Sequence, residues 1–216
     1  MREEQAIARY EEAAALLPPR FRRAALHLPD YRKQRAEEFR LRALYPPTVL
    51  LEEGEIELPY FGADSRITPR DLAQMVDTLT DYSRYACAET LRRGFLSLHG
   101  GFRLGVCGTA VLRDGKVTGL REVSSLSLRI VTERVGLAEP LMPELFSAGG
   151  FQSTLILAPP GGGKTTLLRD LIRVLSLGGE DRAALRVAVA DERGELAVCA
   201  GGETQMALGT HTDVLT

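Results

Sequence analysis

The sequence predicts an α/β protein in two parts, an N-terminal α+β domain at residues 1–136 and an α/β domain at 151–216, joined by a linker at 137–150. Three observations lead to this fold class. A length of 216 residues fits two small domains. Apolar and polar residues alternate between Phe95 and Val131, as in antiparallel strands. From Leu155 to Arg173, a short apolar run, a glycine-rich turn and a helical pattern follow one another.

The start of the chain predicts one helix followed by strands. Residues 1–17, MREEQAIARYEEAAALL, have a charged amphipathic pattern, and the predicted helix should stop at Pro18 and Pro19. Two stretches on either side of Pro46 and Pro47, EEFRLRAL and TVLLEEGEIEL, predict strands. The arginines that crowd this region are interleaved with acids, so we interpret them as a solvated face of mixed charge.

Two further helices are predicted after these strands. Thr68 is a good N-cap, Pro69 suits the first helical position, and the carboxylate of Asp71 favours the positive end of a helix dipole. A second helix is predicted to begin near Asp81 and to end at Gly94. Both helices should complete the N-terminal α+β domain together with the strands that follow.

Tight turns are predicted to join the later strands. The pairs Gly100-Gly101 and Asp114-Gly115 are typical hairpin turns, and they make the unit antiparallel. A short connector helix interrupted by prolines is expected at 137–145. The pair Gly149-Gly150 marks the junction before the second domain.

Composition and charge argue against several classes of protein. Hydrophobic residues make up 44% of the chain, enough for a sizeable core, and the net charge of −2 argues against a strongly basic nucleic-acid binder. Cys87, Cys107 and Cys199 show no C-x-x-C spacing, so we expect a reducing compartment without a disulfide framework or a zinc site. The charged N-terminus is unlike a signal peptide, and no apolar run approaches the roughly 18 residues of a membrane span. We therefore expect a soluble, cytoplasmic protein.

The strongest motif is the stretch LILAPPGGGKTTLLRDLIR. The apolar run Leu155–Leu157 predicts a buried strand at 154–157, and Thr165–Leu175 predicts a helix, so the glycines lie where the strand passes into the helix. Backbone N–H groups at such a turn can hold an anion at the positive end of the helix dipole. The lysine would reach the β- and γ-phosphates, and the threonine after it would be a ligand for Mg²⁺. The pattern G-x-x-x-x-G-K-[ST] is met except that Ala158 replaces the first glycine.

A second apolar strand, Val187–Ala190, is predicted to end in two acids, Asp191 and Glu192. A right-handed crossover from the first strand would bring these acids to the same edge of a parallel sheet as the phosphate loop. Asp191 could then hold magnesium. Alternatively, Glu192 orients the attacking water while a later strand supplies the magnesium ligand, or the acids form only a charged turn.

Five motifs occur in order along the chain: LRRGFLSLHGGFRLGVCGTAV, SSLSLRI, LILAPPGGGKTTLLRDLIR, VADERGELA and GTHTDVL. On these motifs, the chain resembles the stage III sporulation protein AA family from about Phe39 to its last residue. Members are ATPases related to the type II and type IV secretion and pilus motors. The resemblance implies a RecA-like ATPase that forms a homo-oligomeric ring, expected to be a hexamer. This ring would act at a channel between mother cell and forespore during endospore formation, held at the membrane by membrane-embedded channel proteins, with no stably bound nucleic acid.

The resemblance also implies ATP and Mg²⁺ as ligands. The candidate nucleotide-binding residues are Pro160, Gly161, Gly162, Gly163, Lys164, Thr165 and Thr166. Lys164 and Glu192 are the candidate catalytic residues, and Thr165 and Asp191 are the candidate magnesium ligands. By analogy with the secretion motors, Glu195 joins the two preceding acids in a box that includes the catalytic glutamate.

Three further expectations follow from the family pattern. Arg129, in SSLSLRI, is the first candidate for a basic residue that lies over the nucleotide, and Arg103 is the second. His211 stands where the family has an arginine, and the family continues after T-D-V-L with a strand that ends in an acidic pair. We therefore expect the second domain to be truncated at its C-terminus and ATP turnover to be slow. A nucleic-acid-binding module and a nucleotide-gated scaffold without turnover stay open as alternatives.

Overall fold

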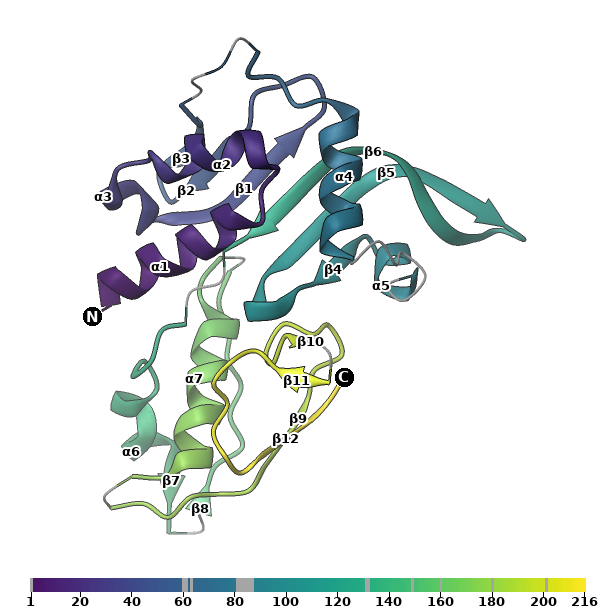
Figure 1. Ribbon diagram of the computed structural model, residues 1–216. Coiled ribbons are helices and arrows are strands. Elements are labelled where there is room, and N and C mark those ends of the chain that lie inside the picture. Colours follow the sequence, from purple (N-terminus) through teal and green to yellow (C-terminus); the bar gives the residue numbers. More distant parts are fainter. Residues whose placement is uncertain are drawn as a thin grey trace. The chain divides into compact units, whose positions relative to one another are not determined.

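The computed structural model describes residues 2–59, 62, 64–80, 88–130, 133–148, 150–159, 161–179, 181–200 and 202–216. The chain forms two compact units. Unit 1 comprises Met1–Leu98 and Phe102–Thr132, and unit 2 comprises His99–Gly101 and Glu133–Thr216 (Figure 1). Helices and strands occur in both units, so the predicted mixed α/β class is confirmed. No helix of the described residues is long and apolar enough to span a membrane.

Three helices open unit 1: α1 (Arg2–Ala15), α2 (Pro19–Leu26) and α3 (Asp30–Lys33). The first confirms the predicted helix, whereas the other two were not predicted. Pro19 occupies the first position of α2, where a missing N–H costs no hydrogen bond, so the proline pair that ends one helix also begins the next. The buried Tyr10 hydroxyl donates to the carbonyl oxygen of Ala25 at 2.9 Å and joins the two helices.

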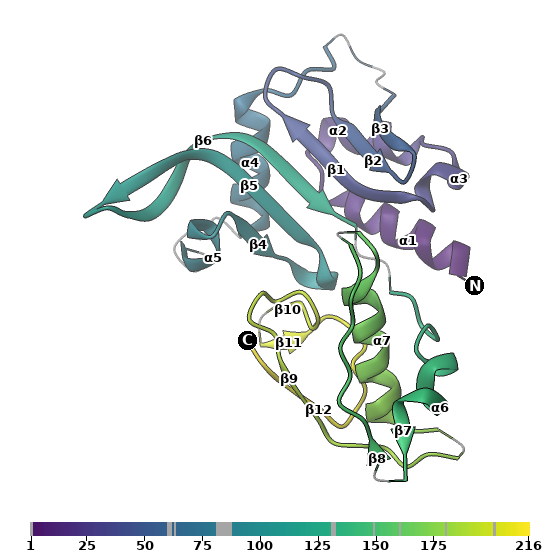
Figure 2. The same cartoon turned by 180° about the vertical axis from the view of Figure 1, so that it is seen from behind.

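Six strands of unit 1 form one antiparallel sheet in the order β3-β2-β1-β6-β5-β4 (Figure 2). The strands are β1 (Ala36–Arg42), β2 (Thr48–Leu51), β3 (Gly54–Glu57), β4 (Phe95–Ser97), β5 (Arg103–Arg113) and β6 (Lys116–Arg129). The predicted hairpins are confirmed. A 3₁₀ turn, η1 (His99–Gly101), lies between β4 and β5, while Asp114 and Gly115, with φ of 51° and 72°, join β5 to β6.

The sheet buries one face. Phe39 and Leu41 of β1, Leu104 of β5, and Leu126 and Leu128 of β6 are at most 2% exposed. These residues alternate with polar ones, as expected for a sheet with a single apolar face. Helices α1, α2 and α4 (Pro69–Leu79) lie over this apolar face (Figures 1 and 2).

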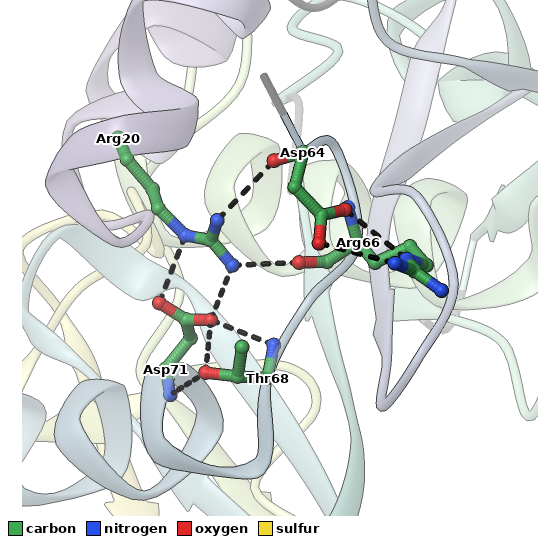
Figure 3. Close-up of polar contacts among 5 residues, drawn as sticks. All are labelled: Arg20, Asp64, Arg66, Thr68 and Asp71. Atoms are coloured by element: carbon green, nitrogen blue, oxygen red, sulfur yellow. Dashed lines mark hydrogen bonds and ion pairs between the residues drawn. The ribbon is translucent and has the colours of Figure 1, made fainter. Parts of the chain in front are cut away.

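The start of α4 shows how local capping and a distant arginine cooperate. Thr68 is the N-cap, as predicted, and it forms a capping box with Asp71, in which each side chain accepts from the backbone N–H of the other (Figure 3). Arg20 of α2 donates to both Asp71 oxygens, at 3.0 and 2.5 Å, and to the Arg66 carbonyl at 2.7 Å. Burial opposes ionisation of Asp71, but these hydrogen bonds from Arg20 and Thr68 hold its pKa below the usual value.

Helix α5 (Ala88–Arg92) stops before Gly94, whose φ is 81°, so the predicted helix end is confirmed. The predicted beginning at Asp81 lies outside the described residues, as does Cys87. In unit 2, η2 (Glu139–Leu141) and α6 (Met142–Leu145) confirm the connector helix.

The long helix of unit 2, α7 (Lys164–Leu177), carries its core. Leu171, Val174 and Leu175 pack with Ala138 and Met142. The segment assigned to the linker thus contributes to this core, and the predicted domain boundaries stay a prediction. The short strands of this unit are β7 (Phe146–Ser147), β8 (Gly150–Phe151), β9 (Val187–Ala190), β10 (Cys199–Ala200), β11 (Glu203–Thr204) and β12 (Thr212–Leu215).

The predicted strand at 154–157 is wrong. These residues are irregular, and Leu155 and Leu157 are 79% and 82% exposed. Strand β9 confirms the second predicted strand, but its parallel partner is β12, which was not predicted. An apolar run forms a strand only where another strand pairs with it, and no strand among the described residues pairs with 154–157. The expected crossover between these two strands is therefore not formed.

Candidate functional site

The loop before α7 favours glycine at three successive positions, at two of them for the backbone conformation and at one for space. Gly161 and Gly163 have φ of 76° and 77°, in the left-handed region. Gly162 donates its N–H to the Pro159 carbonyl at 3.0 Å, and a Cβ added to it would lie 2.9 Å from Ala158 Cβ and 3.0 Å from that carbonyl. The glycines thus let the chain turn tightly against itself. Pro160 lies outside the described residues.

Lys164 begins α7, and Gly163 is its N-cap. The ammonium group of Lys164 donates to the carbonyl oxygens of Ala158 and Pro159, at 2.8 and 2.9 Å. It therefore turns back over the glycine loop, while the first N–H groups of the helix have no partner within the helix. A positive charge and these N–H groups at one loop are the requirements of a phosphate site.

A pocket of about 490 Å³ opens beside this loop. It brings together five predicted site residues: Lys164, Thr165, Asp191, Glu192 and Glu195. Thr165 and Lys164 come from the start of α7, and the acids follow β9. Thr166 lines a separate, much smaller depression that Arg169 and Asp170 also line. The phosphate loop and the acidic segment therefore meet at one pocket, although the strand predicted to precede the loop is not formed.

The acids of the pocket differ in their surroundings. Asp191 is only 4% exposed, and its carboxylate accepts the backbone N–H groups of Glu195, Leu196 and Ala197 at 2.9, 3.0 and 2.9 Å. Glu192 is exposed and Glu195 is half-buried. Glu192 thus lies where solvent and a ligand can reach it, whereas the carboxylate of Asp191 is turned into its own loop.

Two charged residues of α7 were missed by the sequence analysis. Arg169 donates to the carbonyl oxygens of Leu196 and Glu195 at 2.9 and 2.7 Å. Asp170 accepts the N–H of Ala138 and the Nε of Arg173, both at 2.8 Å. A helix position alone does not show which loop a charged side chain will contact.

Burial of Asp170 opposes its ionisation. The hydrogen bonds from Ala138 and Arg173 nevertheless hold the pKa of this carboxyl below its usual value. Asp170 is therefore a charged anchor that ties residue 138 to α7.

The two candidate arginines lie in unit 1. Arg129 of β6 is exposed and stands directly opposite Arg103 of β5 in the antiparallel register, so both side chains lie on one face of the sheet. The guanidinium of Arg103 lies 4.1 Å from the centre of the Phe95 ring. In unit 2, His211 donates its backbone N–H to the Ser176 hydroxyl oxygen at 2.8 Å.

Comparison with known proteins shows that the sequence of this chain matches one protein family over nearly its whole length. The family model described as "Sporulation stage III, protein AA" matches residues 7–216. Stage III sporulation protein AA of Bacillus subtilis (strain 168) is 35% identical over 204 residues, which is 94% of this chain and 64% of that protein. The chain thus spans less than two thirds of the length of this curated relative.

Similar solved structures include an ATPase and a pilus retraction motor. The DotB ATPase of Legionella pneumophila is 16% identical, with a TM-score of 0.39 over 72% of this chain and 42% of that one. The pilus retraction motor PilT with bound ADP is 17% identical, with a TM-score of 0.39 over 71% of this chain and 42% of that one. The family match over nearly the whole chain confirms the resemblance found in the five motifs: the chain belongs to the sporulation stage III protein AA family.

Proposed function

We propose that the chain binds ATP with Mg²⁺ at the pocket beside α7 and belongs to an ATPase that drives assembly or secretion during sporulation. One observation carries this proposal. The pocket joins the lysine and threonine of a glycine-rich phosphate loop to the acids that follow β9. The name of the Bacillus subtilis relative supports the sporulation role.

The residues of the pocket suit the parts of phosphoryl transfer. Lys164 exchanges its hydrogen bonds to two loop carbonyls for the β- and γ-phosphates, and the N–H groups of Gly161, Gly163 and the start of α7 bind the same anion. The Thr165 hydroxyl is the protein ligand for Mg²⁺, an ion that keeps most of its coordination for water and phosphate oxygens. Bound Mg²⁺ neutralises the charge that develops on the phosphates.

Glu192 is the group that orients the attacking water. It is exposed in the pocket that also holds Lys164, so a water molecule between its carboxylate and a terminal phosphate has room. Glu195 lines the same pocket and adds negative charge there. The reaction class is water attack on the γ-phosphate, with positioning and electrostatic stabilisation as the main contributions of the protein.

The wider arrangement is part of the same proposal. The chain works in a homo-oligomeric, RecA-like ring that docks at the membrane through channel proteins between mother cell and forespore. Arg129, with Arg103 opposite it, lies over the nucleotide in that ring. Their opposite positions in the sheet put two positive charges on one face, and this arrangement favours an anion such as a phosphate.

Binding of ATP by the wild-type chain and by Lys164→Ala tests the proposal by calorimetry. Loss of a charged partner for the phosphates should weaken binding at least about tenfold, because a charge-assisted hydrogen bond contributes about 1.5–3 kcal/mol. Thr165→Ala should lose affinity with Mg²⁺ present and little with EDTA. Equal affinities of wild type and Lys164→Ala would refute the phosphate site.

A further inference from the structure

The acidic loop after β9, residues 191–197, carries Glu192 and Glu195 into the pocket, and two buried charged side chains hold it. We propose that Asp191 and Arg169 are positioning residues that clamp this loop to the phosphate-loop helix, and that Asp191 does not bind magnesium. This inference rests on the proposed function, since it assigns roles within that ATP site.

The carboxylate of Asp191 is largely used by its own loop. Its Oδ2 accepts two backbone N–H groups, those of Leu196 and Ala197, and its Oδ1 accepts the N–H of Glu195. A carboxylate offers about four lone-pair sites, so three of them are taken. The main chain of Asp191 is held as well, because its N–H donates to the Leu215 carbonyl of β12 at 2.8 Å and its carbonyl accepts the Gly194 N–H at 2.9 Å. As a metal ligand, the Asp191 carboxylate would have one lone-pair site left in a residue that is 4% exposed, and turning it toward the pocket would break its bonds to the loop N–H groups.

Arg169 holds the same loop by its carbonyl groups. Its guanidinium donates to the carbonyls of Glu195 and Leu196, so the loop is held by its N–H groups on Asp191 and by its carbonyls on Arg169. Arg169 is 7% exposed and follows Thr165 by four residues, so both lie on one face of α7. The residue expected to touch Mg²⁺ and the residue that holds the acidic loop are therefore one helical turn apart. Arg169 therefore links the N-terminal part of α7 to the main chain of Glu195.

Hydrogen exchange of the chain measured by mass spectrometry tests the clamp. In Asp191→Asn, one carboxylate oxygen becomes an NH₂ group that faces backbone donors, so the amides of 195–197 should exchange at least about tenfold faster. Arg169→Met should have the same effect, and Arg169→Lys, which keeps the charge with a single donor group, should have a smaller one. Arg173→Met is the matched control, because Arg173 lies on α7 and is bonded to Asp170 instead. In Arg173→Met, the backbone amides of 195–197 should exchange at the wild-type rate.

Binding of a fluorescent ATP analogue, with Mg²⁺ and with EDTA, separates positioning from metal binding. Asp191→Asn should keep the gain in affinity that Mg²⁺ gives the wild type, whereas Thr165→Ala should lose it. Loss of this gain in Asp191→Asn, with unchanged exchange at 195–197, would make Asp191 a metal ligand and overturn the inference. If Asp191→Asn does not fold, unchanged exchange at 195–197 in Arg169→Met and Arg169→Lys would overturn it instead. A wild-type chain that binds no analogue would refute the proposed function, while the exchange data would still decide the clamp.

Discussion

Gly162→Ala is the sharpest test of the phosphate loop, because this glycine has an ordinary φ and is required only for space. The added Cβ would lie 2.9 Å from Ala158 Cβ, 3.0 Å from the Pro159 carbonyl oxygen and 3.4 Å from Pro159 Cδ. The first of these contacts is closer than packed carbon atoms allow, and the second is to backbone, so the loop must shift. Overpacking of this kind costs about 1–3 kcal/mol. The loop must return to its native shape to bind phosphate, so this cost becomes a loss of roughly 5- to 150-fold in ATP affinity.

The assay is a titration of the chain with a fluorescent ATP analogue in the presence of Mg²⁺, together with urea unfolding. The control is Gly119→Ala in β6, where an added Cβ meets no atom within 4 Å. The control should bind the analogue as the wild type does. Gly162→Ala should bind more weakly while its unfolding changes less than its affinity, because the loop can relax when it is empty. Wild-type affinity in Gly162→Ala would show that this turn does not hold the phosphates.

Three other predictions concern unit 1. Hydrogen bonds from Arg42 and Thr48 lower the pKa of Glu55 from 4.5 to about 2. The contribution of Glu55 to stability is therefore complete above pH 4.5 and is lost as the pH falls toward 2. Urea unfolding across this range should show an acid-sensitive part of the free energy of unfolding that is absent from Glu55→Gln. Leu128→Ala, at a residue that is 0% exposed, should lower the free energy of unfolding by about 2–5 kcal/mol, and a loss below about 0.5 kcal/mol would contradict the described core. Arg129→Ala should weaken ATP binding in the assembled ring by about tenfold. If it and Arg103→Ala both bind ATP normally, neither of these two arginines lies over the nucleotide.

The sequence by itself determined the local features of the chain, which depend on residues that are neighbours along it. The N-cap at Thr68 and the hairpin turn at Asp114-Gly115 were predicted from a few adjacent side chains and were confirmed. The same holds for the glycine turn before α7, where two glycines have positive φ and the third leaves no space for a Cβ. Local backbone preferences act over a few residues, so a single sequence reveals them.

Only the tertiary structure decided which segments pair and which partners charged groups find. An apolar run predicted a strand at 154–157, yet β9 pairs with β12 and Leu157 stays exposed. The acids after β9 were predicted to line the phosphate site, but nothing in the sequence shows that Asp191 accepts three N–H groups of its own loop. In the sequence, Arg169 is one of several charged residues of a helix, and only the fold places the loop carbonyls against it. The physical reason is that strand pairing and burial of charge depend on contacts between distant residues, which the order of neighbouring side chains does not contain.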